Sequence, residues 1–219
     1  MLGFEHIDKS KECLLKSVDS FNLLHKIEES ELNTPLETPK VSQKIEGIQK
    51  APEDSVQISE ISDCLSGFHE LNFENWVNLS PSERMHILQD AENKIAEISH
   101  RFPCSIKVSD MPLGEYGNYY SDDKSITLNA RYVNATDFNS YKETLDTLVH
   151  EGRHAYQDYN INENPVHPRS GEVTNWKWNE FEIGYQNAEL SGFEAYAMQP
   201  VEADARAFAE DVLCAFLKR

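Results

Sequence analysis

A helix is predicted over residues 80–101, where apolar side chains recur mostly every three or four positions and so share one helical face. Ser80 is the expected N-cap, followed by proline at the first helical position and by Glu83, which completes a capping box. The end is expected before Pro103, because proline disfavours helix in the residue before it. The apolar stripe consists of Met85, Ile87, Leu88, Ala91, Ile95 and Ile98.

Three short segments after this helix have the alternation or the β-prone composition that is typical of strands. Residues 104–108 alternate, and residues 116–120 and 125–129 flank a polar tetrapeptide, Ser121-Asp122-Asp123-Lys124, that suits a hairpin turn. We therefore expect a small antiparallel sheet.

The remaining pattern is helical, with one interruption. A helix capped within residues 134–137 should run through Leu145 and Leu148 into His150 and His154. Residues 160–168 contain Asn-Pro and His-Pro steps and predict a loop; helices are expected again over 172–187 and 193–217. The predicted order of elements is helix, small sheet, helix, irregular segment and helix, which indicates an α+β fold.

The first sixty residues differ from the rest of the chain. They are polar, contain few aromatic residues and have no sustained period. The whole chain has 39% hydrophobic residues and a mean hydropathy of −0.59, which is low for a fully packed chain of 219 residues. We predict a flexible acidic leader over residues 1–61 and a single folded domain over residues 62–219.

The net charge of the chain limits the kinds of molecule that it is expected to bind. A formal charge of −18 and a pI near 4.8 disfavour binding to nucleic acid and to anionic membranes. No apolar run approaches the roughly 20 residues that span a bilayer, and residues 1–9 do not have the basic and then apolar pattern of a secretory signal. We expect no membrane insertion, synthesis in the cytoplasm with a signal-independent export route left open, and a neutral or basic polypeptide as partner.

The clearest chemical pattern is His150-Glu151-Gly152-Arg153-His154, an H-E-x-x-H motif in a helical segment. Residues four apart lie on one helical face, so both imidazoles can bind one metal ion. Glu151 lies beside them, where a carboxylate can accept a proton from an attacking water. This arrangement predicts a Zn²⁺ site with Glu151 as general base.

A catalytic zinc site needs a third protein ligand and one open position. His167 lies in the predicted loop, Asp158 follows the motif closely, and Glu202 lies within the predicted last helix. Small residues at Ala203 and Ala205 would let that helix approach the histidine helix closely. The residues alone leave these three candidates open.

The segment Glu202-Ala203-Asp204-Ala205-Arg206-Ala207-Phe208-Ala209 resembles the E-x-E-A-[ND]-x-F-A signature of the ImmA/IrrE metallopeptidases. The H-E-G-R-H-A-Y-Q segment with a following Q-P-V-E-x-D-A helix also resembles metallopeptidase domains of bacterial polymorphic toxins and effectors. The resemblance implies a zincin-like minimal metallopeptidase of the gluzincin type, with His150, His154 and Glu202 on zinc. It further implies a protein or peptide substrate, which adds along a strand edge within residues 116–129, and a bacterial effector or toxin as the setting.

This sequence departs from the gluzincin pattern in the residues expected to orient the histidines. Arg206 stands where many gluzincins have an acid, and Asp204 is about 200° round the helix from Glu202, so Asp146 is an alternative. Two rival functions remain: a zinc amidohydrolase acting on a non-protein or cell-wall amide, and a non-catalytic, metal-stabilised binding module. Candidates for stabilising an oxyanion are Tyr156, His167, Tyr185 and Tyr196.

Overall fold

The computed structural model describes residues 52–218, with side chains from residue 54 onward. Most of the predicted leader therefore lies outside the described residues. The boundary expected at residue 62 falls inside helix α2 (Pro52–Gly67), where Ile61 and Leu65 are fully buried. Residues 52–61 thus belong to the same helix as the first core residues, and the packed domain begins earlier than the sequence pattern indicated.

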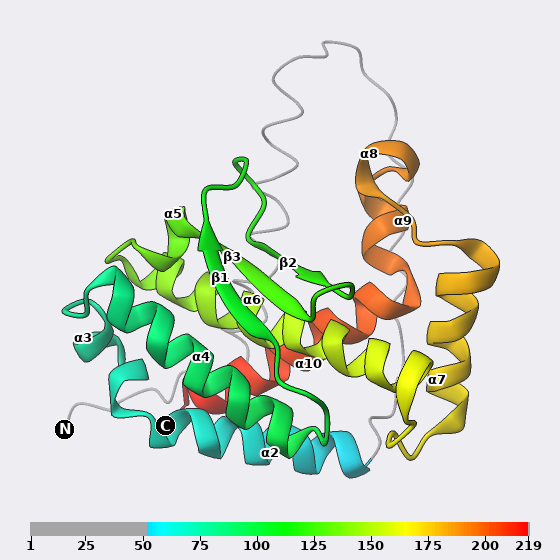
Figure 1. The fold of residues 1–219 in the computed structure, drawn as a ribbon, viewed down its shortest axis with the longest axis horizontal. Helices are drawn as coiled ribbons and strands as arrows, with labels where there is room; N and C mark the ends of the chain where they lie inside the picture. Colours follow the sequence, from blue (N-terminus) through cyan, green and yellow to red (C-terminus); the bar gives the residue numbers. More distant parts are fainter. Residues whose placement is uncertain (1–51, 219) are drawn as a thin grey trace, which may run out of the picture. The chain divides into compact units, whose positions relative to one another are not determined.

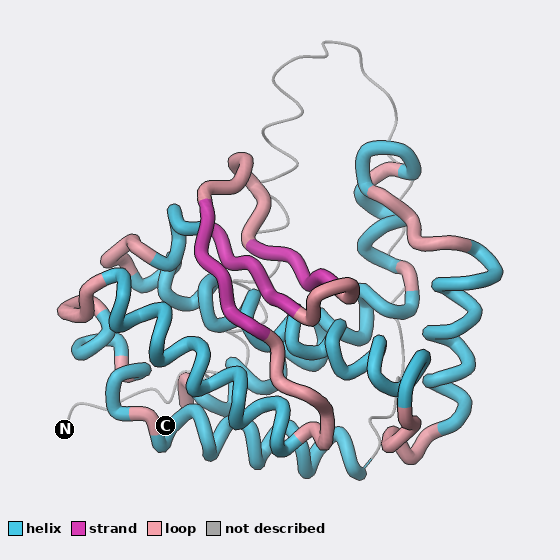
Figure 2. The backbone as a smooth tube through the Cα atoms, in the orientation of Figure 1, coloured by secondary structure: helices cyan, strands magenta, loops and turns pink. Residues whose placement is uncertain are grey.

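The described residues form an α+β fold that is mostly helical, as predicted (Figures 1 and 2). The elements that follow α2 are η1 (His69–Leu71), α3 (Phe73–Trp76), α4 (Pro81–Ile98), β1 (Ser105–Ser109), β2 (Gly117–Tyr120), β3 (Ser125–Asn129), α5 (Ala130–Val133), α6 (Phe138–Asp158), η2 (Tyr159–Glu163), α7 (Ser170–Lys177), η3 (Trp178–Ile183), α8 (Ala188–Ser191), α9 (Phe193–Met198) and α10 (Pro200–Phe216).

The three strands form a mixed sheet in the order β1-β3-β2, so the expectation of an antiparallel sheet was wrong for one of its two pairings. Strands β2 and β3 pair antiparallel around the predicted turn at residues 121–124, where Lys124 has a positive φ of 49°. Strand β1 pairs parallel with β3, with Ile106 opposite Ile126. The alternation marks each strand but not its partner, and β2 is left as an edge strand.

The predicted capping box of α4 is confirmed. The backbone N–H of Ser80 donates to Glu83 Oε2 at 2.7 Å, and the N–H of Glu83 donates to Ser80 Oγ at 3.3 Å. The helix ends at Ile98, before Pro103, as expected. Its apolar stripe packs against the core, except for Met85, which is exposed; the helix contacts α2, α6 and β1.

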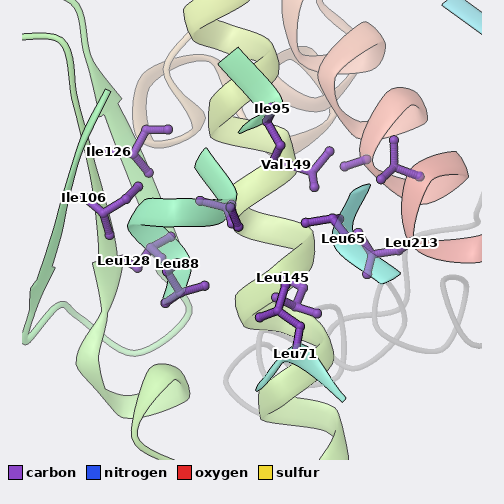
Figure 3. Close-up of a cluster of buried hydrophobic side chains, with 14 of the residues drawn as sticks. Leu65, Leu71, Leu88, Ile95, Ile106, Ile126, Leu128, Leu145, Val149 and Leu213 are labelled. Atoms are coloured by element: carbon purple, nitrogen blue, oxygen red, sulfur yellow. The ribbon is translucent and has the colours of Figure 1, made fainter. Parts of the chain in front are cut away.

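Helix α6 runs through the middle of the domain, between the sheet and helices α2 and α10 (Figure 1). The main core therefore contains side chains from every layer (Figure 3). Leu145 and Val149 of α6 face this core, and Asp137 caps the helix, within the range predicted for the cap. The other labelled members are Leu65, Leu71, Leu88, Ile95, Ile106, Ile126, Leu128 and Leu213.

The C-terminal helix predicted over 193–217 is two helices. Helix α9 ends at Met198 and α10 begins at Pro200, with Gln199 in an extended conformation between them. Proline fits the first turn of a helix and excludes helix from the residue before it, which accounts for the break. The helix predicted over 172–187 is likewise shorter, because α7 and η3 end at Gly184, whose φ of 78° suits glycine.

A buried ion pair joins α4 to the segment before β1. The two terminal nitrogens of Arg101 donate to the two carboxylate oxygens of Glu92 at 2.6 and 2.9 Å, and both side chains are almost fully buried. We expect Glu92→Gln to lower the free energy of unfolding by about 3–5 kcal/mol, because it leaves the buried guanidinium without its countercharge. Urea unfolding would measure this. Glu97→Gln, in an exposed pair with Lys94, is the control, and equal losses in both variants would contradict the argument.

Candidate metal centre

Helices α6 and α10 bring together three side chains that the sequence singled out. His150 and His154 lie one turn apart on α6, with their Nε2 atoms 3.0 Å from each other. Glu202, in the first turn of α10, faces both: Oε2 lies 3.4 Å from His150 Nε2, and Oε1 lies 3.3 Å from His154 Nε2. The close approach of α10 to α6 is helped by Ala205, which is fully buried.

The donor atoms of these three side chains are spaced as they would be around a small metal ion. Ligand atoms at about 2.0–2.1 Å from zinc in a tetrahedron lie about 3.3 Å from one another. The two Nε2 atoms are 3.0 Å apart, and each has a different carboxylate oxygen of Glu202 at 3.3 or 3.4 Å, which is close to that spacing. Glu202 is 1% exposed, and its Oε2 is buried without a hydrogen-bond partner. An unpaired buried carboxylate oxygen is costly unless a cation balances it. The residues present therefore suit Zn²⁺.

The electrostatics of the cluster agree with a cation site. Burial raises the pKa of Glu202, yet the facing His150 and His154 hold that pKa well below its ordinary value. Burial lowers the pKa of His154, but its hydrogen bond with Glu202 and the nearby charge of Glu151 raise the pKa to about 9. The carboxylate thus stays ionised and attracts positive charge to the point between the two imidazoles.

His154 and Glu202 line a cavity of about 460 Å³, and Glu151 lines it as well. The backbone N–H of Tyr119 donates to Glu151 Oε2 at 2.8 Å, which ties this carboxylate to edge strand β2. The cavity is lined by residues of β2, α6, η2, η3 and α10, together with Tyr185 and Tyr196. Its wall includes Gly117, Asn118, Tyr119, Tyr120, Ser121, Glu151, His154, Gln157, Asp158, Ile161, Asn179, Glu180, Tyr185, Tyr196, Val201 and Glu202.

Two of the four candidate oxyanion donors line this cavity. The Tyr185 hydroxyl donates to Glu202 Oε1 at 2.5 Å, and the rings of Tyr185 and Tyr196 pack edge to face. Burial and the charge of Glu202 raise the pKa of both phenols well above the ordinary value. Both hydroxyls are therefore protonated donors, and Tyr185 already holds the candidate ligand.

The other candidates from the sequence are engaged elsewhere. His167 lies 3.0 Å from the Tyr156 hydroxyl through Nδ1 and 2.6 Å from Glu172 through Nε2, and neither His167 nor Tyr156 lines the cavity. Asp158 does line it, but accepts from the Tyr119 hydroxyl and from Lys124 at 2.5 and 2.7 Å. Of the three candidates for a third ligand, Glu202 is the one that meets both histidines.

The residues around the histidines differ from those considered from the sequence. Arg206 donates to the carbonyl of Ala197. Asp146 is half-buried; burial raises its pKa, and the charge of His150 opposes that rise. The residue that sequence reasoning missed is Gln157, whose Oε1 lies 2.9 Å from His154 Nδ1. Its i,i+3 spacing from His154 was the available signal.

Close packing explains why position 152 of the motif is a glycine. A Cβ built there would lie 3.1 Å from the guanidinium of Arg101, which is held by its buried pair with Glu92. The histidine helix thus rests closely on this ion pair.

Among residues 52–218 no helix combines the length and the apolar composition that crossing a bilayer requires. Comparison with known proteins adds no relative: no protein family, no curated protein and no solved structure matches this chain. The interpretation of the site therefore depends on its own geometry.

Proposed function

We propose that this protein is a zinc-dependent metallopeptidase that hydrolyses peptide bonds of a protein substrate. The observation that carries the proposal is the cluster of His150, His154 and Glu202, whose facing donor atoms lie 3.0–3.4 Å apart, with Glu151 beside His154 and Glu202 in the lining of one cavity. Bound zinc supplies Lewis acidity, which makes water nucleophilic near neutral pH and polarises a carbonyl.

Glu151 is placed to handle the protons of the reaction. Its Oε2 accepts the backbone N–H of Tyr119, which leaves Oε1 for a proton taken from water and passed to the leaving amine. Tyr185 and Tyr196 provide protonated hydroxyls on the opposite wall, where one of them can donate to the oxygen of the reacting carbonyl.

Strand β2 supplies the surface for an extended substrate. It is an edge strand, and Gly117, Asn118 and Tyr119 line the cavity beside Glu151. An extended peptide that adds to this edge forms backbone hydrogen bonds irrespective of its sequence, while its side chains enter the cavity alternately. The acidic chain favours neutral or basic polypeptides, and the resemblance to effector domains extends the proposal to a bacterial effector or toxin.

The proposal is tested with the full chain on a casein-type protein and on a muropeptide in parallel. We expect about one zinc per chain and hydrolysis of the protein substrate that 1,10-phenanthroline stops and added Zn²⁺ restores. Hydrolysis of the muropeptide alone would replace the peptidase with a cell-wall amidohydrolase. Zinc binding without hydrolysis of either substrate would indicate a binding module.

A further inference from the structure

We propose that Gln157 is a positioning residue, which fixes His154 in the tautomer and ring orientation that leave Nε2 free to bind the metal ion. The inference rests on the proposed metal site and adds a component that the motif does not contain. It depends on a chain of contacts from His154 through Gln157 and Asp204 to Arg153 and Asp54.

The orientation of the Gln157 amide is determined by its acceptors. Its Nε2 donates to the carbonyl of Val201 at 2.9 Å and to Asp204 Oδ2 at 2.7 Å. Both partners are acceptors only, so a flipped amide would set three oxygens against one another. The atom that lies 2.9 Å from His154 Nδ1 is therefore the amide oxygen.

An amide oxygen accepts and does not donate, so Nδ1 of His154 must carry the hydrogen of this contact. A neutral imidazole has one N–H, and its other nitrogen has a free lone pair. Because Gln157 holds the hydrogen on Nδ1 of His154, the nitrogen that gives up its proton when a metal ion binds is Nε2, which faces Glu202 and His150. Gln157 thus selects the form of the ring that can bind a metal at the cluster.

Asp204 is in turn held by a buried cation. Arg153 donates to its two oxygens from Nε at 2.9 Å and Nη2 at 3.1 Å. Arg153 is 2% exposed, and Nη2 also donates to Asp54 of α2 at 3.2 Å. The rings of Tyr156, Trp176 and Phe208 lie 4.3–5.5 Å from its guanidinium carbon.

These contacts explain how Asp204 can influence the metal site although it does not contact the histidines. Asp204 is two residues after Glu202 and bonds no histidine, but it orients the amide that does. Outer partners of metal-binding histidines commonly change metal affinity about 10–100-fold when they are removed. The same range is expected here.

The test compares the zinc dissociation constant of the full chain with that of Gln157→Met, which keeps the length of the side chain but removes both polar atoms. We expect the constant to rise about 10–100-fold. In the zinc-loaded wild type, an NMR resonance of the His154 Nδ1–H proton should be protected from exchange, and Gln157→Met should remove that protection. Asp204→Asn, a milder change that leaves Gln157 present, should raise the constant less.

Asn160→Ala is the matched control, because Asn160 is a fully buried amide in η2, directly after α6. It bonds Tyr156, Val166 and His167 and none of the three proposed zinc ligands. It should lower the melting temperature and leave the zinc constant within about twofold, the scatter expected when no outer partner is lost. An unchanged constant in both Gln157→Met and Asp204→Asn, or an equal rise in Asn160→Ala, would overturn the inference while the metal site stands. A wild-type chain without zinc would overturn both.

Discussion

Glu151→Gln should reduce kcat on a protein substrate by about 10²–10⁴-fold, the range that general acid–base catalysis contributes. The amide has nearly the shape of the carboxylate but cannot accept a proton from water at neutral pH. Its Oε1 can still accept the Tyr119 N–H, which holds the wild-type carboxylate at 2.8 Å. The side chain should therefore stay in place while its chemistry is lost.

The measurement pairs initial rates with zinc content by mass spectrometry. Zinc should remain bound in Glu151→Gln, because Glu151 does not belong to the group of donor atoms formed by His150, His154 and Glu202. Glu194→Gln removes the same charge from an exposed position on α9 and serves as the control, with rates near wild type. Full activity of Glu151→Gln would exclude this residue as the base.

The parts of the fold that follow from local chemistry could be predicted from the sequence. Ser80 and Glu83 determine the start of α4, and residues 121–124 form the turn between β2 and β3. The parallel partner of β1 could not be predicted, because strand alternation does not encode which neighbour a strand joins. The break between α9 and α10 at Pro200 could have been predicted, because the effect of proline on the preceding residue is local.

Some features of the candidate site could likewise be predicted from the sequence, and others could not. The two histidines follow from helical period, whereas Glu202 was one of three candidates that the residues left open and was singled out by the resemblance. The support of His154 required α2, α6 and α10 to be packed first, since Asp54, Arg153 and Asp204 belong to three different helices. The i,i+3 spacing of Gln157 from His154 could be seen in the sequence, but the contacts of Gln157 with α10 that orient its amide could not.

The second large effect concerns Glu202. Glu202→Ala should weaken zinc binding on the order of 10²–10³-fold, because an apparent affinity of about 10–16 kcal/mol for zinc is shared among its ligands. The change leaves two imidazoles with their Nε2 atoms 3.0 Å apart and deprives the Tyr185 hydroxyl of its acceptor. Hydrolysis should fall with zinc occupancy and recover partly at high zinc concentration, unlike the loss in Glu151→Gln.

Glu210→Ala, two turns further along α10 and half-buried, is the control for a lost carboxylate on the same helix, and its zinc affinity should equal that of the wild type. If Glu202→Ala also retains full affinity, the assignment of the third ligand is wrong. Asp158 then becomes the candidate, because it lines the same cavity, whereas His167 is paired with Tyr156 and Glu172 outside it. Asp158 would have to leave Lys124 to reach the ion, so Asp158→Ala would then remove the zinc that Glu202→Ala kept.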